Sequence, residues 1–283
     1  MAILIPRKQE FWQRQPGAIR EIDYSRELAR GLTTLITGVG DGRLYDIAHG
    51  SDFASNTATV RNGTDGIGAE YASQYTKFQN HDDYSITGAM SIAAIIDIDT
   101  LTNYSGIAAC QTTTQIGGFE LRAGNGQTDS KVMIHRANAG GFRQHRPTTN
   151  ALIAGDKNAY IGISAADGLL ETVPAMYVKG VKQTLSVGGN GTGQATLATG
   201  ELNVGQRYDG VTRLDGAVYY LAFWDVELSE EEHAELRQNP YQLLKKRQKY
   251  WVLPTAGATA VLDNDLISAM HFQRHYEPIA MGE

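Results

Sequence analysis

The chain has 283 residues, 42% of them hydrophobic, and a formal net charge of −6. This size allows one large sandwich or two small domains with a buried core, and the acidic balance argues against a protein that coats nucleic acid. Cys110 is the only cysteine, so an intrachain disulfide and a cysteine-rich zinc site are excluded. No apolar run approaches the roughly 18–20 residues of a membrane helix. The first residues show no secretory pattern, so we expect folding in a cytoplasm and no membrane partner.

Residues 1–30 are rich in charge and poor in aliphatic runs, with Phe11 and Trp12 as their prominent apolar side chains. Such a segment gains little by folding alone, because it has little apolar surface to offset its ordering entropy. We therefore predict an N-terminal arm in which Phe11 and Trp12 bind a partner. Packing of the two aromatic rings back onto the parent domain is the alternative.

From residue 31 to about residue 226, short apolar segments are bounded by Gly, Asn, Asp or Ser, a pattern that is typical of strands and tight turns. The predicted strands are Thr33–Thr37, Thr57–Val60, Gly66–Glu70, Tyr75–Phe78, Met90–Ile98, Gly106–Gln111, Gly118–Ala123, Lys131–His135, Ala159–Ser164, Ala175–Val178, Gly200–Val204 and Leu214–Trp224. Turns are expected at Asn62-Gly63 and over the glycine cluster at 188–193. Because no helical segments alternate with these strands, we expect a sandwich or jelly roll and not a parallel sheet.

Both faces of the segment at 217–224 are apolar or aromatic, which indicates a central strand covered on both sides. Strict alternation would place Val218, Tyr220, Ala222 and Trp224 on one face.

One helix is expected directly after this strand. Ser229 and Glu232 have the spacing of a capping box, in which each side chain satisfies a free backbone N–H at the helix start. The helix should end near Gln238, because Pro240 disfavours helical geometry at Asn239.

Residues 241–283 are predicted to form a second, C-terminal arm. A basic run at 245–249 would meet an acidic partner or stay solvated, and the apolar segment at 250–253 follows it. Aromatic side chains concentrate interface energy, so Tyr250 and Trp251 are the expected partner-binding residues of this arm.

Several segments carry a family resemblance. The closing strand and helix of concanavalin A-like, laminin-G-like jelly rolls resemble the segment Leu214-Asp-Gly-Ala-Val-Tyr-Tyr-Leu-Ala-Phe-Trp-Asp-Val-Glu-Leu-Ser-Glu-Glu-Glu-His-Ala-Glu-Leu236. The entry to the first strand in phage versions of this domain resembles Glu27-Leu-Ala-Arg-Gly-Leu32. The stretch that follows the helix there is similar to Asn239-Pro240-Tyr241-Gln242-Leu243-Leu244. The resemblance spans roughly residues 24–244, and its two ends carry it.

The resemblance implies an all-β, concanavalin A-like jelly-roll sandwich over 31–240, with one short C-terminal helix and arms at 1–30 and 241–283. In tailed bacteriophages such domains occur in virion structural proteins. The resemblance therefore implies a non-enzymatic capsid decoration, head-fibre or tail component, made in the bacterial host cytoplasm and located in the virion. Its partners would be other virion proteins, such as the major capsid or tail proteins, and further copies of itself.

The carboxylates of Glu21-Ile-Asp23-Tyr-Ser-Arg-Glu27 suggest catalysis at first sight. Laminarinase-type glucanases share the jelly roll and use a Glu-x-Asp-x-(x)-Glu strand, in which alternate carboxylates act on a sugar. Here the last Glu lies one residue too far along, and the segment precedes the first predicted strand. We interpret it as a charged linker and expect no catalytic residue.

Arg207, Tyr208 and Asp209 combine an aromatic ring with hydrogen-bonding groups near the last strand, as a sugar-binding site requires. They are the expected glycan contacts of an alternative function, a carbohydrate-binding module that recognises a host-surface glycan. Ordinary turn chemistry explains the same residues.

No metal site is expected from the histidines, because their one His-x-x-x-His spacing, His271 and His275, lies in a loosely patterned tail. Calcium is the ion that would suit loops of this fold, and its candidate ligands are Asp82, Asp83, Asp209 and Asp215. None of them lies in a recognisable calcium loop, so no cofactor is expected.

Overall fold

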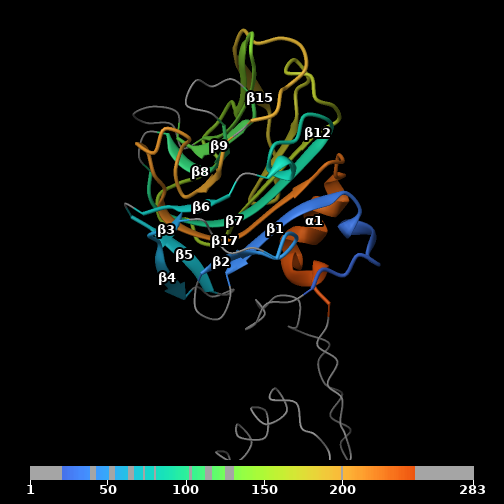
Figure 1. Ribbon diagram of the computed structural model, residues 1–283. Helices are drawn as coiled ribbons and strands as arrows, with labels where there is room; N and C mark the ends of the chain where they lie inside the picture. The colour runs from blue at the N-terminus through green and yellow to red at the C-terminus, as the bar shows by residue number, and fades with distance from the viewer. Residues whose placement is uncertain are drawn as a thin grey trace, which may run out of the picture. The chain divides into compact units, whose positions relative to one another are not determined.

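The computed structural model describes residues 21–38, 43–50, 55–62, 67–72, 74–79, 81–101, 104–111, 117–124, 131–198 and 200–245. These residues form two antiparallel sheets, of nine and eight strands, that enclose a common hydrophobic core (Figure 1). The prediction of an all-β jelly-roll sandwich with one short helix is confirmed. Within this part of the chain, no helix is both long and apolar enough to cross a membrane.

The nine-stranded sheet contains, in spatial order, β14 (Val181–Lys182), β13 (Ala175–Val178), β12 (Ala159–Ala165), β7 (Met90–Thr100), β17 (Asp215–Trp224), β1 (Leu32–Gly38) and β2 (Leu44–Asp46), with β5 (Ile67–Tyr71) on β17 and β4 (Thr59–Asn62) on β5. The eight-stranded sheet runs through β15 (Leu185–Gly189), β11 (Gly141–Pro147), β10 (Val132–Asn138), β9 (Phe119–Ala123), β8 (Ser105–Cys110), β16 (Leu202–Val204), β6 (Thr76–Phe78) and β3 (Ser55–Asn56). The helix α1 (Glu230–Gln238) and the 3₁₀ turns η1 (Glu27–Ala29), η2 (Asp82–Tyr84) and η3 (Pro240–Leu243) complete the described elements.

The main core lies between the sheets. The rings of Phe119 in β9 and Phe223 in β17 meet edge to face, with their centroids 5.3 Å apart, and so join the two layers. Burying a side chain of this size contributes about 1.5–3 kcal/mol, so this pair is a substantial part of the contact between the sheets.

β17 is the central strand that its sequence indicated. It pairs with β7 on one side and with β1 and β5 on the other. A shift of register between Val218 and Tyr220 inserts Tyr219 as an extra residue, which corrects the strict alternation expected from the sequence. Val218 therefore faces the main core, whereas Tyr219, Tyr220 and Trp224 face the opposite side.

A second apolar cluster covers the outer face of the nine-stranded sheet. It combines η1, α1 and η3 with the outward side chains of β17 and β1, as the helix lying against the sheet in Figure 1 shows. Trp224 is fully buried there, and Leu28 and Leu236 lie in the same cluster. The two ends of the family resemblance thus meet in space, because both ends supply this second core.

The predicted capping box is confirmed. Oγ of Ser229 accepts the N–H of Glu232 at 3.2 Å, and Oε2 of Glu232 accepts the N–H of Ser229 at 2.7 Å. α1 ends at Gln238, as expected from Pro240.

His233 connects α1 to the sheet below it through a chain of hydrogen bonds. Ser91 donates its hydroxyl to the carbonyl oxygen of Val226, so Ser164 donates to Ser91 and accepts from Nε2 of His233. Nδ1 of His233 is then left to accept from the hydroxyl of Tyr160, at 2.7 Å. Burial lowers the pKa of His233 to about 4, so the ring is neutral at pH 7.

The strands that the sequence did not predict are β2, β3, β11, β14 and β15. β11 is rich in charged and polar side chains, and its backbone pairing with β10 and β15 decides its conformation. β15 includes Gly188 and Gly189, which were expected to belong to a turn, because both pair with β11.

The two limits of the described chain lie side by side. Ile22 and Leu244 form an antiparallel bridge. The N–H of Asp23 donates to the carbonyl oxygen of Leu243 at 2.7 Å, and the N–H of Lys245 donates to the carbonyl oxygen of Glu21 at 2.9 Å. Residues 21–29 and 240–245 therefore pack with the sandwich. The predicted arm residues Phe11, Trp12, Tyr250 and Trp251 lie outside the described residues.

Candidate ligand-binding face

The outer face of the eight-stranded sheet carries a group of buried polar side chains. Along β9, Phe119, Leu121 and Ala123 point into the main core, so Glu120 and Arg122 point to the opposite face. Glu120 is fully buried and Arg122 is 8% exposed. Charged side chains are seldom buried to this extent unless they are paired, so their partners decide what the face can do.

Two arginines neutralise Glu120. Nε of Arg207 lies 2.7 Å from Oε1 of Glu120, and Nη1 of Arg122 lies 3.4 Å from Oε2. Arg207 also contacts Asp209, through Nη1 at 3.1 Å. The fold thus places two cations and two carboxylates in one group, in which Glu120 is already committed to ion pairs.

Two tyrosine rings lie against the same guanidinium groups. The centroid of the Tyr104 ring is 4.6 Å from Cζ of Arg122 and 5.4 Å from Cζ of Arg207, so Tyr104 contacts both cations. The Tyr208 ring also contacts Arg207, with its centroid 5.1 Å from Cζ of Arg207. Tyr104 has φ 59°, a left-handed backbone conformation that is unfavourable for a bulky side chain. Such strain is common at binding and catalytic sites.

His135 in β10 extends the polar group toward β11. Its Nδ1 lies 3.3 Å from Nε2 of Gln111, and its ring packs against that of Phe142 with 4.7 Å between centroids. Burial, with a smaller contribution from the charges of Arg122 and Arg207, lowers the pKa of His135 to about 3. The ring is therefore neutral at physiological pH and acts as a hydrogen-bonding group.

One part of the group is closed to solvent and another part is open. Among the described residues, Oε1 of Gln111 and Nε of Arg122 are buried without a hydrogen-bond partner. Tyr104 and Tyr208 are only half-buried, so part of each ring reaches solvent. We call Tyr104, Glu120, Arg122, Arg207 and Tyr208 the tyrosine–arginine face. It offers aromatic surface beside fixed donors and acceptors, the combination that recognises polyhydroxylated ligands.

The sequence placed Arg207, Tyr208 and Asp209 in a candidate site; in the structure Arg207 and Tyr208 belong to this face, and Asp209 is paired with Arg207 beside it. It did not identify Tyr104, Glu120 or Arg122, because their approach depends on strand pairing across β8, β9 and β16. A Glu-x-Arg pair in a predicted strand was the one local signal, and such pairs are common on solvated sheet faces.

The carboxylates of the N-terminal segment lie away from this face and form local contacts. Glu21 is exposed beside Lys245, whose hydrogen bond lowers the pKa of Glu21. A hydrogen bond from Ser25 lowers the pKa of Asp23. A general acid requires a raised pKa, which Glu21 and Asp23 do not have. The segment expected to be a linker packs with the sandwich, because Ile22, Leu28 and Ala29 are buried in the second cluster. Among the aspartates weighed as calcium ligands, Asp215 accepts from Thr100 and Asp209 is paired with Arg207.

No protein-family model matches the sequence, and no curated protein matches it either. Solved structures do match in fold. Domain 4 of AbnA, an extracellular GH43 arabinanase from Geobacillus stearothermophilus solved in complex with arabinotriose, is 14% identical with a TM-score of 0.52; the match covers 74% of this chain and 98% of that one.

Two toxin domains match similarly. The binding domain of Paraclostridial Mosquitocidal Protein 1 is 13% identical with a TM-score of 0.53, and that of botulinum neurotoxin serotype D/C is 10% identical with a TM-score of 0.52. Each match covers 75% of this chain but only 52% of the toxin domain, so the chain spans about half the length of these two structures. At these identities the likeness establishes the β-sandwich fold.

Proposed function

We propose that this chain is a non-enzymatic binding protein that recognises a carbohydrate through the tyrosine–arginine face. The observation that carries the proposal is the contact of Arg207 with Tyr104, Tyr208 and Glu120 at once. This contact holds two aromatic rings in fixed positions beside charged hydrogen-bonding groups. A preformed arrangement binds with a smaller entropy cost than one that must be ordered by its ligand.

The same geometry argues against glycoside hydrolysis. Hydrolysis requires two carboxyl groups on opposite sides of the scissile bond, one as acid and one as nucleophile or base. Glu120 is fully buried, and Glu120 and Asp209 are both ion-paired with the same Arg207, so this face does not present two carboxyl groups to opposite sides of a ligand. Fold relatives that are described as binding domains or were solved with an oligosaccharide agree with a binding role.

A glycan array probed with the full chain tests this proposal, with Tyr208→Ala as the diagnostic variant. We expect specific binding that is lost in Tyr208→Ala and retained in Tyr24→Ala. Tyr24 is a matched control because the residue is 63% exposed and lies far along the chain from this face. Unfolding curves of both variants separate loss of binding from loss of folding. An array without signal, or binding that Tyr208→Ala leaves unchanged, would reject the carbohydrate proposal.

A second candidate function is that of a bacteriophage virion structural protein, as the family resemblance implies. The observation in its favour is the bridge between Ile22 and Leu244. Because the two limits of the sandwich meet there, residues 1–20 and 246–283 both join it at one place. Two segments with a common attachment point suit a protein that is fixed to neighbouring capsid or tail proteins and displays its sandwich. A glycan-binding face would serve such a particle, so the two functions are compatible.

Quantitative mass spectrometry of purified particles from the source tests the second candidate. A copy number on the scale of the major capsid protein would identify a decoration protein, and a low, fixed copy number would identify a tail or fibre component. Absence from the particles would reject the virion role and leave the carbohydrate proposal to stand or fall by the array.

A further inference from the structure

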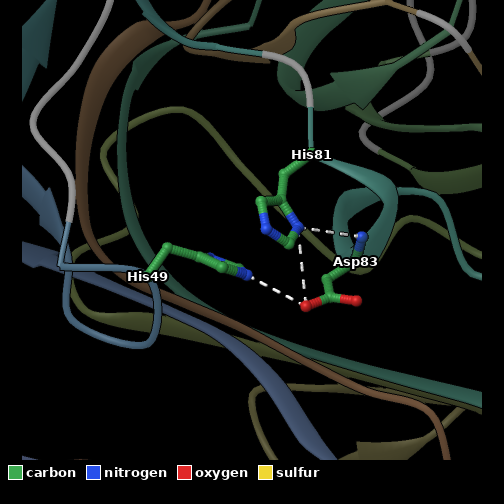
Figure 2. A group of neighbouring side chains, drawn as sticks. All are labelled: His49, His81 and Asp83. Carbon is green, nitrogen blue, oxygen red and sulfur yellow. Dashed lines mark hydrogen bonds and ion pairs between the residues drawn. The ribbon is translucent and has the colours of Figure 1, made fainter.

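Three metal-binding side chains from two separate turns gather at η2. His49 lies in the turn after β2, whereas His81 and Asp83 come from the start of η2, and Figure 2 shows all three converging. Nε2 of His49 lies 3.0 Å from Oδ2 of Asp83, and Nδ1 of His81 lies 3.5 Å from the same oxygen. Two ligands bound to zinc at about 2.0–2.2 Å are roughly 3.3 Å apart in a tetrahedral site, so these two separations are close to two of its edges. All three ligand atoms lie within 4.8 Å of one another.

Asp46 orients His49 from behind. Its Oδ2 lies 2.6 Å from Nδ1 of His49 and also accepts the hydroxyl of Tyr84 at 2.7 Å. Its Oδ1 accepts the backbone N–H of Ala48 at 3.0 Å, and the Asp46 side chain is fully buried. Nδ1 of His49 therefore keeps its proton and donates it, which leaves Nε2 directed at Asp83. Histidines that bind metals almost always donate their other ring N–H to such a partner.

We propose that Nε2 of His49, Nδ1 of His81 and a carboxylate oxygen of Asp83 bind one zinc ion, with Asp46 as the positioning residue behind His49. Two imidazoles and one carboxylate suit zinc, whereas calcium takes six to eight oxygen ligands. The side chains of His81 and Asp83 are 47% and 48% exposed, so an ion can enter and keep a position for water. At Nδ1 of His81 the zinc ion would replace one long hydrogen bond, of 3.3 Å, from the N–H of Asp83.

The competing interpretation is a charged hydrogen-bond cluster without metal. The hydrogen bond to Asp46, aided by Asp83, raises the pKa of His49 to about 9, so in the absence of metal a proton occupies Nε2. The rings of His49 and His81 also pack at 3.8 Å between centroids, which would hold the two turns together without an ion. Direct measurement of zinc binding separates the two interpretations.

The test uses the untagged full chain, freed of metal with a chelator and titrated with zinc chloride by calorimetry. We expect one zinc ion per chain, and a loss of zinc affinity of at least about tenfold in His81→Ala and in Asp83→Asn. Asp46→Asn removes the carboxylate that orients His49 and should lower the zinc affinity by about 10–100-fold. Asp82→Asn is the matched control, because Asp82 is an exposed neighbour outside the cluster and its substitution changes the charge by the same amount as Asp83→Asn. Cobalt titrated in place of zinc should give the visible absorption of a tetrahedral complex.

His271 and His275 lie outside the described residues and could also take up zinc. The double variant His271→Ala/His275→Ala should keep the tight zinc ion. Zinc lost in this double variant and retained in His81→Ala would overturn the proposal, as would a chain that binds no zinc or prefers calcium. Because His81 and Asp83 are exposed, both single variants should fold like the wild type, and circular dichroism checks that they do.

Discussion

The indole Nε1 of Trp224 donates a hydrogen bond of 2.8 Å to the carbonyl oxygen of Leu28, and so ties the last strand to the first described turn. Both residues are buried in the second cluster on the outer face of the nine-stranded sheet. In Trp224→Phe this hydrogen bond is lost and the smaller ring leaves a cavity. We expect the free energy of unfolding to fall by about 2–4 kcal/mol, measured by urea denaturation. Val211→Ala, at an 80% exposed site, should change it by less than about 0.5 kcal/mol.

Glu120→Gln should destabilise the sandwich, because it leaves the buried Arg122 without its carboxylate and Arg207 with Asp209 alone. Breaking a buried ion pair from one side typically costs about 3–5 kcal/mol. The matched control is Glu201→Gln, which removes an exposed ion pair with Lys77 and should cost less than about 1 kcal/mol. Equal losses in the two variants by chemical denaturation would show that Glu120 is solvated and the face is open.

Stability should fall between about pH 6.5 and pH 4 in a way that depends on His233. Burial lowers the pKa of His233 to about 4 in the folded chain, so over this range the unfolded state binds more protons than the folded state. The free energy of unfolding therefore decreases as the pH falls, by up to about 1.4 kcal/mol per pH unit for this one ring. In His233→Gln the slope should be smaller by that amount. Thermal unfolding at pH 7, 6 and 5 measures it, and identical slopes would contradict the assignment.

Gly162→Ala should displace His233 and loosen α1. A Cβ at position 162 would lie 2.5 Å from Nδ1 of His233, too close for any real contact. We expect a loss of stability of about 1–3 kcal/mol. Gly88→Ala makes the same chemical change at a glycine with no atom within 4 Å of the new Cβ, and should be close to neutral. Hydrogen exchange of the α1 amides distinguishes local loosening of the helix from a general loss of stability.

Features that depend on neighbouring residues were predictable from the sequence, and those that depend on register were not. The helix start is an example of the first kind, because Ser229 and Glu232 satisfy each other's backbone within one turn. The bulge at Tyr219 is of the second kind, since nothing in an apolar run marks which residue will be left unpaired. β11 was missed because Arg143, Gln144 and His145 have the composition of a loop, and only pairing on both sides makes them a strand.

The candidate sites also differ in whether their residues are neighbours in the sequence. Arg207, Tyr208 and Asp209 are consecutive, so their combination could be noticed before any fold was known. Tyr104 and Glu120 reach Arg207 only through the folding of separate strands. The zinc ligands were missed for the same reason: His49 and His81 come from turns separated by β3, β4, β5 and β6, and no spacing rule links them.

The bridge between Ile22 and Leu244 also determines how the sandwich would respond to mechanical load. The chain enters at Glu21 and leaves at Lys245, at the same end of an antiparallel pair. A force that pulls the two terminal segments apart would open the main-chain hydrogen bonds of Lys245 and Asp23 one after the other, starting from the outside. The strands of both sheets would bear no tension until these hydrogen bonds had opened. The junction therefore protects the sandwich from a force applied between its two terminal segments.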